Sequence, residues 1–488
     1  RYSRGQPREM HQQSVNAYNA LGTEAIKGSR VMKGITEAIY YHSPVFMQNL
    51  LVSAYGYKLY RKRYSGSLYR EIMEKVRLSR SWNSEEIKAY QSERLHEMVK
   101  HCRLNIPYYQ QQFAEHGIHE NDITSTEHIT RLPILEKQKL KEHSQLFTES
   151  GTKPFMLQHT SGSTGTPLTL MVNEETYKLA MALLVDHEEN HGVPFGAKRA
   201  TFAGRMVQPA TDMTPPFARM NRAENQKLFS SYHMNSQTFP WYRAELDRFQ
   251  PAELIGYPSA ICDLAAHYKE AGVSPAFRPT AIVTNSETLL EWQRTIIEDV
   301  FDCKVCDYYG TAEYVLFAGQ DKSGIYRLNP LIGITELLAQ PNVGEAKRLI
   351  ATTLTNTTMP LLRYDLGDTA ERQSEHHSGT VVHQLKTING RVDDYIETLD
   401  GRKIGRMDHI FKGLDGIFEA QIIQDAPDHC TIKIISQPAF SVVDRSVLQS
   451  NFLARTGGAF KLTVETVSSI PRGSNGKFKS VIRNISLG

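Results

Sequence analysis

The sequence predicts an α/β protein: a large multi-layer N-terminal domain with a helical extension before it and a small α+β domain after it. Three observations predict this fold. Helical periodicity runs to about residue 125, short apolar runs alternate with amphipathic stretches over 155–370, and the rhythm changes near residue 390. Such alternation is typical of strands that are buried on both faces of a sheet. We expect domains at 1–125, 126–389 and 390–488.

The clearest helix of the first region begins after Asn83, which forms a capping-box pattern with Glu86. Its apolar stripe includes Leu95 and Cys102, and it must end before Pro107. Residues 1–13 are polar and resemble an expression tag that leads to a native start at Met10.

A stretch at residues 55–64 interleaves aromatic side chains with basic ones and follows an apolar run at 45–52. One interpretation is contact with a membrane surface or an anionic polymer. The other is a helix packed on the large domain with its basic face in water. We expect the second, because charged faces are commonly just solvated.

The remaining elements are expected from apolar runs and their punctuation. Strands of the large domain are predicted at Phe155–Gln158, Arg199–Ala203, Leu254–Gly256, Ala281–Val283 and Lys304–Tyr308. The small C-terminal domain is predicted to hold strands at Tyr395–Leu399, Ala420–Ile423, Thr431–Ile435 and Lys461–Val467, and one helix from Val442 to about Ala454.

Composition excludes several classes of protein. The 488 residues carry 56 basic and 53 acidic side chains, a formal net charge of +3 that argues against a nucleic-acid scaffold held by bulk charge. No apolar window is long enough to span a bilayer, and no internal repeat is present. Five cysteines do not make a disulfide framework in a chain of this length, so we expect a reducing cytoplasm.

The most informative segment is a loop rich in glycine and hydroxyl residues, between Gln158 and Leu170, which we expect to join two strands of a hairpin. Glycines allow several N–H groups to point at one place, and hydroxyls add donors, so such a loop can hold a triphosphate. It is not a Walker loop, because no Gly-Lys-Ser/Thr follows. The residues concerned are Thr160, Ser161, Gly162, Ser163, Thr164, Gly165 and Thr166.

This loop resembles the phosphate-binding signature of adenylate-forming enzymes, the superfamily of acyl-CoA synthetases, luciferases and peptide-synthetase adenylation domains. Four further segments resemble that superfamily in the same order: 308–313, 362–368, 389–394 and 471–477. Within it, the stretch 391–413 and the long helical N-terminus look most like the phenylacetate–CoA ligase family, in the branch associated with capsular-polysaccharide genes.

The resemblance implies a reaction in which a carboxylate attacks the α-phosphorus of ATP and expels pyrophosphate, giving an acyl-adenylate. Catalysis then rests on positioning and on neutralising phosphate charge. Glu313 is expected to bind Mg²⁺, since a carboxylate is a hard oxygen ligand. Lys477 is expected to neutralise the reacting oxygens, with Thr160 as a further catalytic residue and Asp393 as the hinge about which the small C-terminal domain turns as a mobile lid.

Nucleotide contacts are expected from several segments. Asp368 should accept hydrogen bonds from the ribose, Arg391 should contact phosphate or ribose, and Lys403 is a candidate for facing the phosphates. The loop residues 161–166 join this set, together with Ser286, Glu287, Tyr309, Gly310 and Thr311.

The carboxylate pocket is expected to involve Tyr257, Pro258 and Ser259. His159 is either near the substrate carboxylate or a satisfied polar neighbour. Cys303 and Cys306 form a single CxxC without a second ligand pair, so we interpret them as buried strand residues rather than a metal site.

Two departures bear on the activity. Relatives usually carry Ser or Thr where this chain has Ala312, so one hydroxyl contact to the nucleotide is missing. The segment 396–405 differs from the small-residue run through which aryl-CoA ligases thread the pantetheine arm, which puts coenzyme A in doubt as the acceptor.

We therefore expect an ATP- and Mg²⁺-dependent ligase that activates a small carboxylic acid and transfers it to an amine or thiol, in surface-polysaccharide or secondary metabolism. The first alternative is an aryl-CoA ligase that uses coenzyme A. The second is a degenerate nucleotide-binding module, which only Ala312 favours.

Overall fold

The computed structural model describes residues 39–149, 151–159, 168–205, 207–209, 211–287, 289, 291–339, 347–373, 379–389, 395–404, 407–411, 414, 417–436, 440–468, 470 and 481–485. The first part is helical, as predicted. Its helices and short turns are α2 (Val45–Tyr64), α3 (Ser67–Ser79), α4 (Ser84–Asn105), α5 (Pro107–His116), η1 (Glu120–Asp122), η2 (Thr126–Arg131), α6 (Lys137–Glu142) and η3 (Ser144–Phe147).

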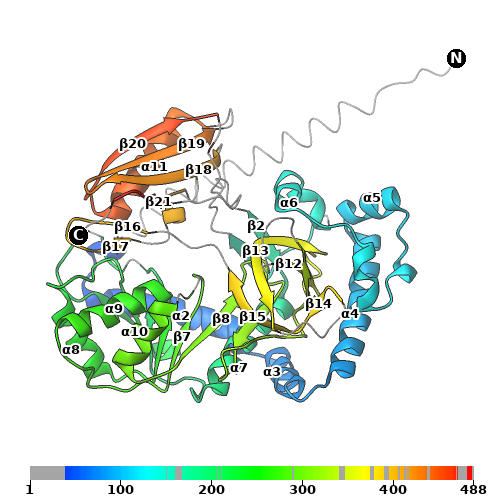
Figure 1. Ribbon diagram of the computed structural model, residues 1–488, viewed down its shortest axis with the longest axis horizontal. Helices are drawn as coiled ribbons and strands as arrows, with labels where there is room; N and C mark the ends of the chain where they lie inside the picture. The colour runs from blue at the N-terminus through cyan, green and yellow to red at the C-terminus, as the bar shows by residue number, and fades with distance from the viewer. Residues whose placement is uncertain are drawn as a thin grey trace.

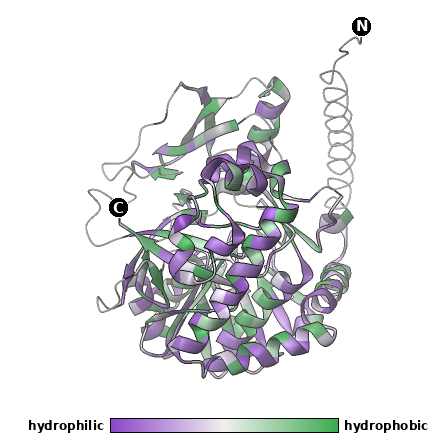
Figure 2. Cartoon of the chain, turned by 90° about the vertical axis from the view of Figure 1, so that its right-hand side faces the viewer, coloured by the Kyte–Doolittle hydropathy of each residue, from purple (hydrophilic) through white to green (hydrophobic). Residues whose placement is uncertain are grey.

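Helix α4 begins where the capping pattern predicts. The Asn83 side-chain oxygen accepts from the backbone N–H of Glu86 at 3.0 Å, and the Glu86 carboxylate accepts from the N–H of Asn83 at 2.7 Å. The helix ends at Asn105 and the next begins at Pro107, since proline fits the first turn of a helix but not its interior. Figure 2 faces this side of the molecule and shows hydrophilic and hydrophobic residues alternating along its helices.

The body of the protein is built on one 13-stranded sheet in the order β14-β11-β12-β13-β15-β10-β9-β8-β7-β6-β3-β5-β4 (Figure 1). Its strands are β3 (Arg199–Phe202), β4 (Ala218–Asn221), β5 (Gln226–Phe229), β6 (Glu253–Gly256), β7 (Ala281–Thr284), β8 (Val305–Gly310), β9 (Phe317–Gln320), β10 (Tyr326–Leu328), β11 (Gly333–Leu338), β12 (Lys347–Thr353), β13 (Tyr364–Arg372), β14 (Val381–Val382) and β15 (Gln384–Asn389).

The sheet has two halves that differ in strand direction. From β5 to β8 the neighbours are parallel, and every pair from β8 to β14 is antiparallel. Strand β8 belongs to both halves, because it pairs with β7 on one side and β9 on the other. The α/β class predicted from the sequence is confirmed.

The strands of the parallel half are buried on both faces, as their continuous apolar runs predict. Ile282 of β7 packs in a cluster with α9 (Pro258–Glu270) and α10 (Glu291–Phe301), whereas Val283 packs on the other face near Leu184 of α7 (Glu174–Asn190). Helix α8 (Phe239–Phe249) adds Tyr242 and Leu246 to the first cluster, and η4 (Arg222–Glu224) joins β4 to β5.

The antiparallel half shares a core with the N-terminal helices. Leu95 and Cys102 of α4 and Phe113 of α5 lie in one buried cluster with Leu349 of β12 and Tyr364 of β13. The predicted hairpin is present beside this half, as β1 (Met156–His159) paired antiparallel with β2 (Thr169–Val172).

The C-terminal part forms a small α+β unit. Strands β18 (Ile417–Ala426), β19 (His429–Ser436), β20 (Lys461–Thr466) and β21 (Val481–Arg483) lie in the order β20-β19-β18-β21, packed with helix α11 (Val442–Thr456). A short hairpin, β16 (Ile396–Glu397) with β17 (Lys403–Ile404), and the turn η5 (Met407–Phe411) complete it. We call residues 395–485 the lid. Throughout the described part of the chain, no helix combines the length and the apolar character needed to cross a membrane.

Candidate active site

Several of the predicted site residues lie in segments that follow parallel strands. The turn with Ser286 and Glu287 follows β7, the segment of Tyr257 follows β6, and the segment of Glu313 follows β8. Because neighbouring parallel strands end at the same edge of a sheet, these loops meet at one edge. Ligands of open α/β sheets bind at this edge.

Glu313 is buried at this edge, with one carboxylate oxygen held by two partners. The Tyr364 hydroxyl donates to Oε1 at 3.1 Å, and the ammonium of Lys137 lies 3.5 Å from the same oxygen. Tyr364 comes from β13 and Lys137 from α6, so three separate segments meet at this carboxylate. Tyr364 fixes its orientation, and Lys137 brings a positive charge beside it.

Tyr309 and Asp368 link two of the segments that resemble the superfamily. The Tyr309 hydroxyl donates to Asp368 Oδ2 at 2.6 Å, which joins the end of β8 to the middle of β13. Next along the chain, Thr311 Oγ1 is buried and has no hydrogen-bond partner among the described residues. A buried hydroxyl without a partner costs free energy unless something else bonds to it, so Thr311 fits a place where a polar ligand binds.

The hairpin that carries the Gly/Ser/Thr loop contacts the segment of Glu313. Gln158, in β1, donates to the hydroxyl of Tyr314 at 2.8 Å, and Tyr314 directly follows Glu313. His159 pairs with Thr169 across the hairpin. The two ends of the loop are therefore held against the β8 segment, although residues 160–167 themselves lie outside the described part of the chain.

The other predicted nucleotide turn contacts the predicted carboxylate pocket. Glu287 Oε2 accepts a hydrogen bond from the backbone N–H of Ser259 at 3.1 Å. Pro258 and Ser259 open helix α9, so Glu287 lies at the N-terminus of a helix, where a negative charge is favourable. This contact occupies one oxygen of Glu287 within the protein.

Tyr257 lies against a glycine that the sequence analysis did not select. Gly204 follows β3 with φ of +59°, and a Cβ atom there would come within 2.7 Å of Tyr257 and 3.2 Å of the Tyr232 hydroxyl. A glycine is required here both for its backbone conformation and for its lack of a side chain. Gly204, Tyr232 and Tyr257 thus follow three strands of the parallel half and meet at its edge.

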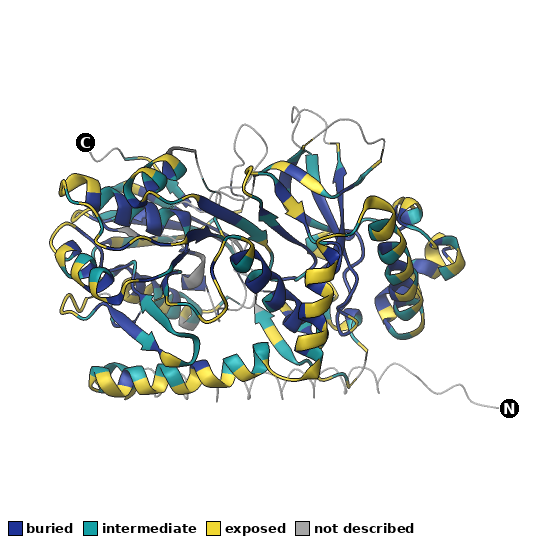
Figure 3. Cartoon of the chain, turned by 90° about the horizontal axis from the view of Figure 1, so that it is seen from below, coloured by how far each residue is buried: buried dark blue, intermediate teal, exposed yellow. Residues whose placement is uncertain are grey.

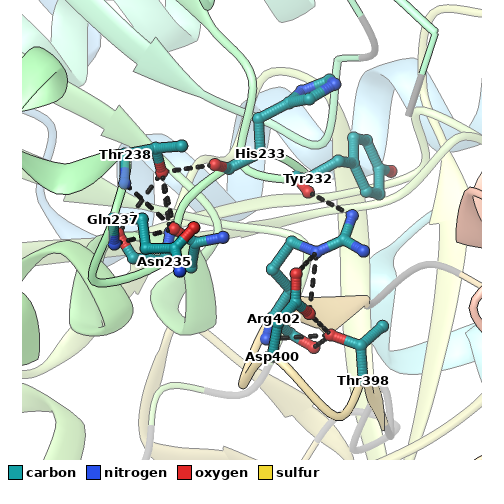
Figure 4. A network of polar contacts seen from close by, with 8 residues as sticks. All are labelled: Tyr232, His233, Asn235, Gln237, Thr238, Thr398, Asp400 and Arg402. Carbon is teal, nitrogen blue, oxygen red and sulfur yellow. Dashed lines mark hydrogen bonds and ion pairs between the residues drawn. The ribbon is translucent and has the colours of Figure 1, made fainter. Parts of the chain in front are cut away.

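Tyr232 also joins the body to the lid. Its hydroxyl donates to the carbonyl of Gly204 at 3.0 Å, and its backbone carbonyl accepts from Arg402 of the lid at 3.3 Å (Figure 4). The guanidinium of Arg455, in α11, donates to the Tyr232 hydroxyl and lies over the ring at 4.7 Å from its centroid. The Tyr232 ring is part of the buried cluster that forms the core of the lid.

Arg402 is held within its own hairpin as well. Its guanidinium donates to the Asp400 carboxylate at 2.8 Å, and Thr398 donates to the same carboxylate (Figure 4). These residues belong to the segment 396–405, which differs in sequence from the small-residue run of aryl-CoA ligases. A buried, paired arginine stands in that segment instead.

The two cysteines of the CxxC motif lie at the start of β8. Burial raises the pKa of the Cys306 thiol to about 12 and that of Cys303 to about 11, so both stay protonated. Cys306 lies in β8, and Cys303 lies just before that strand, half-buried. Among the described residues, no group of three or more His, Cys, Asp or Glu side chains is arranged to hold a metal ion.

The remaining predicted site residues are Arg391, Asp393 and Lys477, which lie outside the described residues, and Lys403, whose backbone lies in β17. Conversely, the sequence analysis did not identify Lys137, Tyr232 and Gly204. Tyr364 lies inside the segment 362–368, which resembles the ribose-binding segment of the superfamily, so this resemblance could have identified it. The other three follow no motif.

Together, the fold and this edge of the sheet define the class. The structure of 2-hydroxyisobutyryl-CoA ligase in complex with 2-HIB-AMP and CoA superposes with a TM-score of 0.52, covering 83% of this chain and 91% of that one at 17% identity. The chain therefore has the fold of an adenylate-forming ligase.

Sequence comparisons narrow the resemblance. The chain is 28% identical over 457 residues to protein CapK of Staphylococcus aureus, covering 92% of this chain and 99% of that protein. It is 22% identical to a phenylacetate–coenzyme A ligase of Thermus thermophilus, covering 82% and 96%. The family model of the CapK C-terminal domain matches residues 396–484. The predicted resemblance to adenylate-forming enzymes, and within them to phenylacetate–CoA ligases and CapK, is confirmed.

Proposed function

We propose that this protein is an AMP-forming ligase that activates a carboxylic acid with ATP. A carboxylate oxygen forms a bond to the α-phosphorus while the bond from that phosphorus to pyrophosphate breaks. A thiol or amine then attacks the acyl carbon of the acyl-adenylate, and AMP leaves. The observation that carries the proposal is the meeting of Glu313, Thr311 and the Tyr309–Asp368 pair, from β8 and β13, beside the anchored ends of the Gly/Ser/Thr loop.

Each of these groups has a part in binding ATP. The loop residues 160–166 would surround the triphosphate, and the unpartnered hydroxyl of Thr311 supplies one of the contacts that Ala312 cannot. Asp368, oriented by Tyr309, would accept hydrogen bonds from the ribose hydroxyls. Arg391, Lys403 and Lys477 would neutralise negative charge, with Lys477 acting in the adenylation step.

A magnesium ion fits the donor set. Glu313 offers a carboxylate whose orientation is fixed by Tyr364, and Mg²⁺ is usually held by one or two carboxylates together with phosphate oxygens. Bound there, the ion would neutralise charge on the phosphates of ATP. Lys137 would also neutralise charge on the phosphates, since its ammonium lies 3.5 Å from Oε1 of Glu313.

The carboxylic acid would bind beside the parallel half, near Tyr257 and Gly204. The two tyrosine rings and the glycine that lie together there would present an aromatic surface to a small acid with an apolar or aromatic body. His159 directly precedes the loop that would hold the phosphates, and it would lie near the substrate carboxylate.

We propose that the acceptor is an amine or a thiol, with coenzyme A as the alternative. The cluster of Thr398, Asp400 and Arg402 occupies the segment that aryl-CoA ligases fill with small residues, which disfavours passage of a pantetheine arm. The likeness to phenylacetate–coenzyme A ligases favours the alternative. The likeness to the capsule-associated branch favours a place in surface-polysaccharide or secondary metabolism. All five cysteines are free, which suits the reducing cytoplasm.

The test is acid-dependent exchange of pyrophosphate into ATP over a panel of carboxylic acids, followed by acyl transfer with coenzyme A or amines as acceptors. Glu313→Gln should lower exchange by about 10²–10³-fold, the scale of losing one charge contact in the transition state. Glu371→Gln is the matched control, because this carboxylate lies on the same strand as Asp368 and pairs only loosely with Lys386, at 3.7 Å. ATP binding without exchange for any acid would favour the degenerate module instead.

A further inference from the structure

Helix α2 presents an unusual surface to the solvent. Its exposed side chains recur every three or four residues, so they share one side of the helix. We call this side the outer face of α2; Figure 3 shows it as the exposed side of the long helix along the lower edge of the view. It consists of Phe46, Met47, Leu50, Leu51, Ala54, Tyr55, Tyr57, Lys58 and Arg61.

The outer face is apolar over its first three turns. Phe46 is 70% exposed and Leu50 is 61% exposed, and Tyr55 and Tyr57 are exposed beside them. Single exposed apolar residues are common on protein surfaces. A row of six along one helix is a contiguous apolar patch, and such patches mark interaction surfaces.

The opposite face of α2 lies against the body and carries both polar side chains and half-buried apolar ones, such as Val52 and Tyr60. The Asn49 side chain accepts from the N–H of Met220 at 2.8 Å, Ser53 donates to the carbonyl of Met220 at 3.1 Å, and Gln48 accepts from Arg219 at 2.5 Å. A surface helix normally buries its apolar side and shows its polar side to water. Helix α2 departs from this pattern, because polar residues of its inner side bond to β4 while a row of apolar side chains points away from the protein.

A glycine lets the inner face of α2 approach β4 closely. A Cβ atom at Gly56 would lie 2.1 Å from the side chain of Asn221, so the contact between α2 and β4 depends on the absence of a side chain there. The orientation of α2 is therefore fixed by specific contacts on its inner side.

The charge of helix α2 indicates which kind of partner its outer face would bind. Residues 45–64 include four basic residues and no Asp or Glu. Arg63 is paired with Glu224 at 2.9 Å, and Lys62 lies over the ring of Phe155. Lys58 and Arg61 are exposed at the end of the apolar row. Apolar and aromatic residues followed by exposed basic ones are the composition of helices that lie in the interface of an anionic membrane.

Two other occupants of the outer face fit the charge less well. Residues 1–38 carry six basic and three acidic side chains, so they have the same sign as α2. A second copy of the chain would bring two such basic helices together. We infer that the outer face of α2 docks the protein on the surface of an anionic lipid membrane, with Phe46, Leu50 and their neighbours in the interface and Lys58 and Arg61 against the headgroups.

The experiment is flotation of the full chain with vesicles of phosphatidylglycerol and phosphatidylcholine in equal parts, and with vesicles of phosphatidylcholine alone. The protein should float with the first and much less with the second, and high salt should weaken the binding. Lys58→Gln with Arg61→Gln should lower the partition coefficient about 30-fold, since each basic side chain near an anionic surface contributes about fivefold. Phe46→Gln with Leu50→Gln should lower it at least about tenfold.

The matched control is Lys100→Gln with Leu104→Gln, which changes one basic and one apolar position on α4; Leu104 is exposed. This variant should float like the unchanged protein. Thermal melting of each variant shows whether it folds, and glutamine keeps the helix propensity.

Three results would overturn the inference: no flotation of the unchanged protein, equal flotation of the Phe46/Leu50 variant, or a dimer that this variant abolishes while vesicles bind nothing. The proposed ligase activity is a separate matter, because soluble acids can be assayed without vesicles.

Discussion

Arg455 of the lid and Tyr232 of the body form a contact that combines a hydrogen bond to the tyrosine hydroxyl with stacking over its ring. The same hydroxyl donates to the carbonyl of Gly204, next to the predicted carboxylate pocket. The position of the lid and the shape of that pocket are therefore joined through one side chain.

The first prediction concerns this contact. Tyr232→Phe keeps the ring but removes a hydrogen bond to a charged group, which is worth about 1.5–3 kcal/mol. The population of the docked lid, relative to undocked states, should therefore fall by about tenfold or more. Hydrogen–deuterium exchange of the hairpin 396–404 should accelerate accordingly. Tyr57→Phe, on the exposed side of α2, is the control. Unchanged exchange in a folded Tyr232→Phe protein would show that the hydroxyl does not hold the lid.

The second prediction concerns the close approach at Gly204. Gly204→Ala should raise the KM for the carboxylic acid while the KM for ATP changes little, because the new methyl group meets Tyr257. Gly196→Ala is a matched control, since Gly196 has φ of +82° but nothing within 4 Å of its would-be Cβ. Both variants bear the backbone cost of about 1–2 kcal/mol. Equal kinetic effects in the two would mean that only backbone strain matters.

The third prediction concerns Asp307, which accepts hydrogen bonds from Thr284 and Tyr326 between β7, β8 and β10. Burial raises the pKa of its carboxyl to about 6. The pKa of this carboxyl is therefore higher in the folded protein than in the unfolded chain, where it is near 4. Protonation of Asp307 then stabilises the fold, fully below about pH 4, and this stabilisation is lost as the pH rises through 6. Relative to Asp307→Asn, the unfolding free energy should fall by about 3 kcal/mol from pH 4 to pH 7. Urea titrations across this range measure it, and parallel curves would contradict it.

The fourth prediction concerns Lys477. Lys477→Ala should leave the fold intact and lower adenylation by about 10²–10³-fold, the effect of losing one preorganised charge contact. Transfer from a preformed acyl-adenylate should fall much less if the lid turns about Asp393 between the two steps. Single-turnover measurements of both steps on one preparation test this, and equal losses would contradict the two-position lid.

The elements with a local cause could be predicted from the sequence. Helix α4 is set by Asn83 and Pro107, and the strands β6 and β7 by their continuous apolar runs. The hairpin around the Gly/Ser/Thr loop was likewise expected, and so was helix α11. These features depend on neighbours within a few residues, where capping, proline and periodicity act.

Contacts made across the fold could not be predicted in this way. Lys137 reaches Glu313 from 176 positions away, and Arg455 reaches Tyr232 from 223 positions away. No local sequence pattern identifies Lys137 or Arg455 as a site residue, because the role of each depends on a partner that is distant in the sequence. Helix α2 was expected to pack on the large domain, and it does. The expectation of a merely solvated basic face was incomplete, because the outward side of the helix is mostly apolar.

The double membership of β8 has a consequence for how such ligases diversify. In the proposed assignment, the acid pocket comes from loops of the parallel half, whereas Asp368 and Tyr364 come from the antiparallel half. The β8 segment, with Tyr309, Thr311 and Glu313, lies where the two halves join. Changes of acid preference can therefore accumulate at positions such as 204 and 257 without touching Asp368 or Tyr364. One chemical step can in this way be kept while the molecule it is applied to changes.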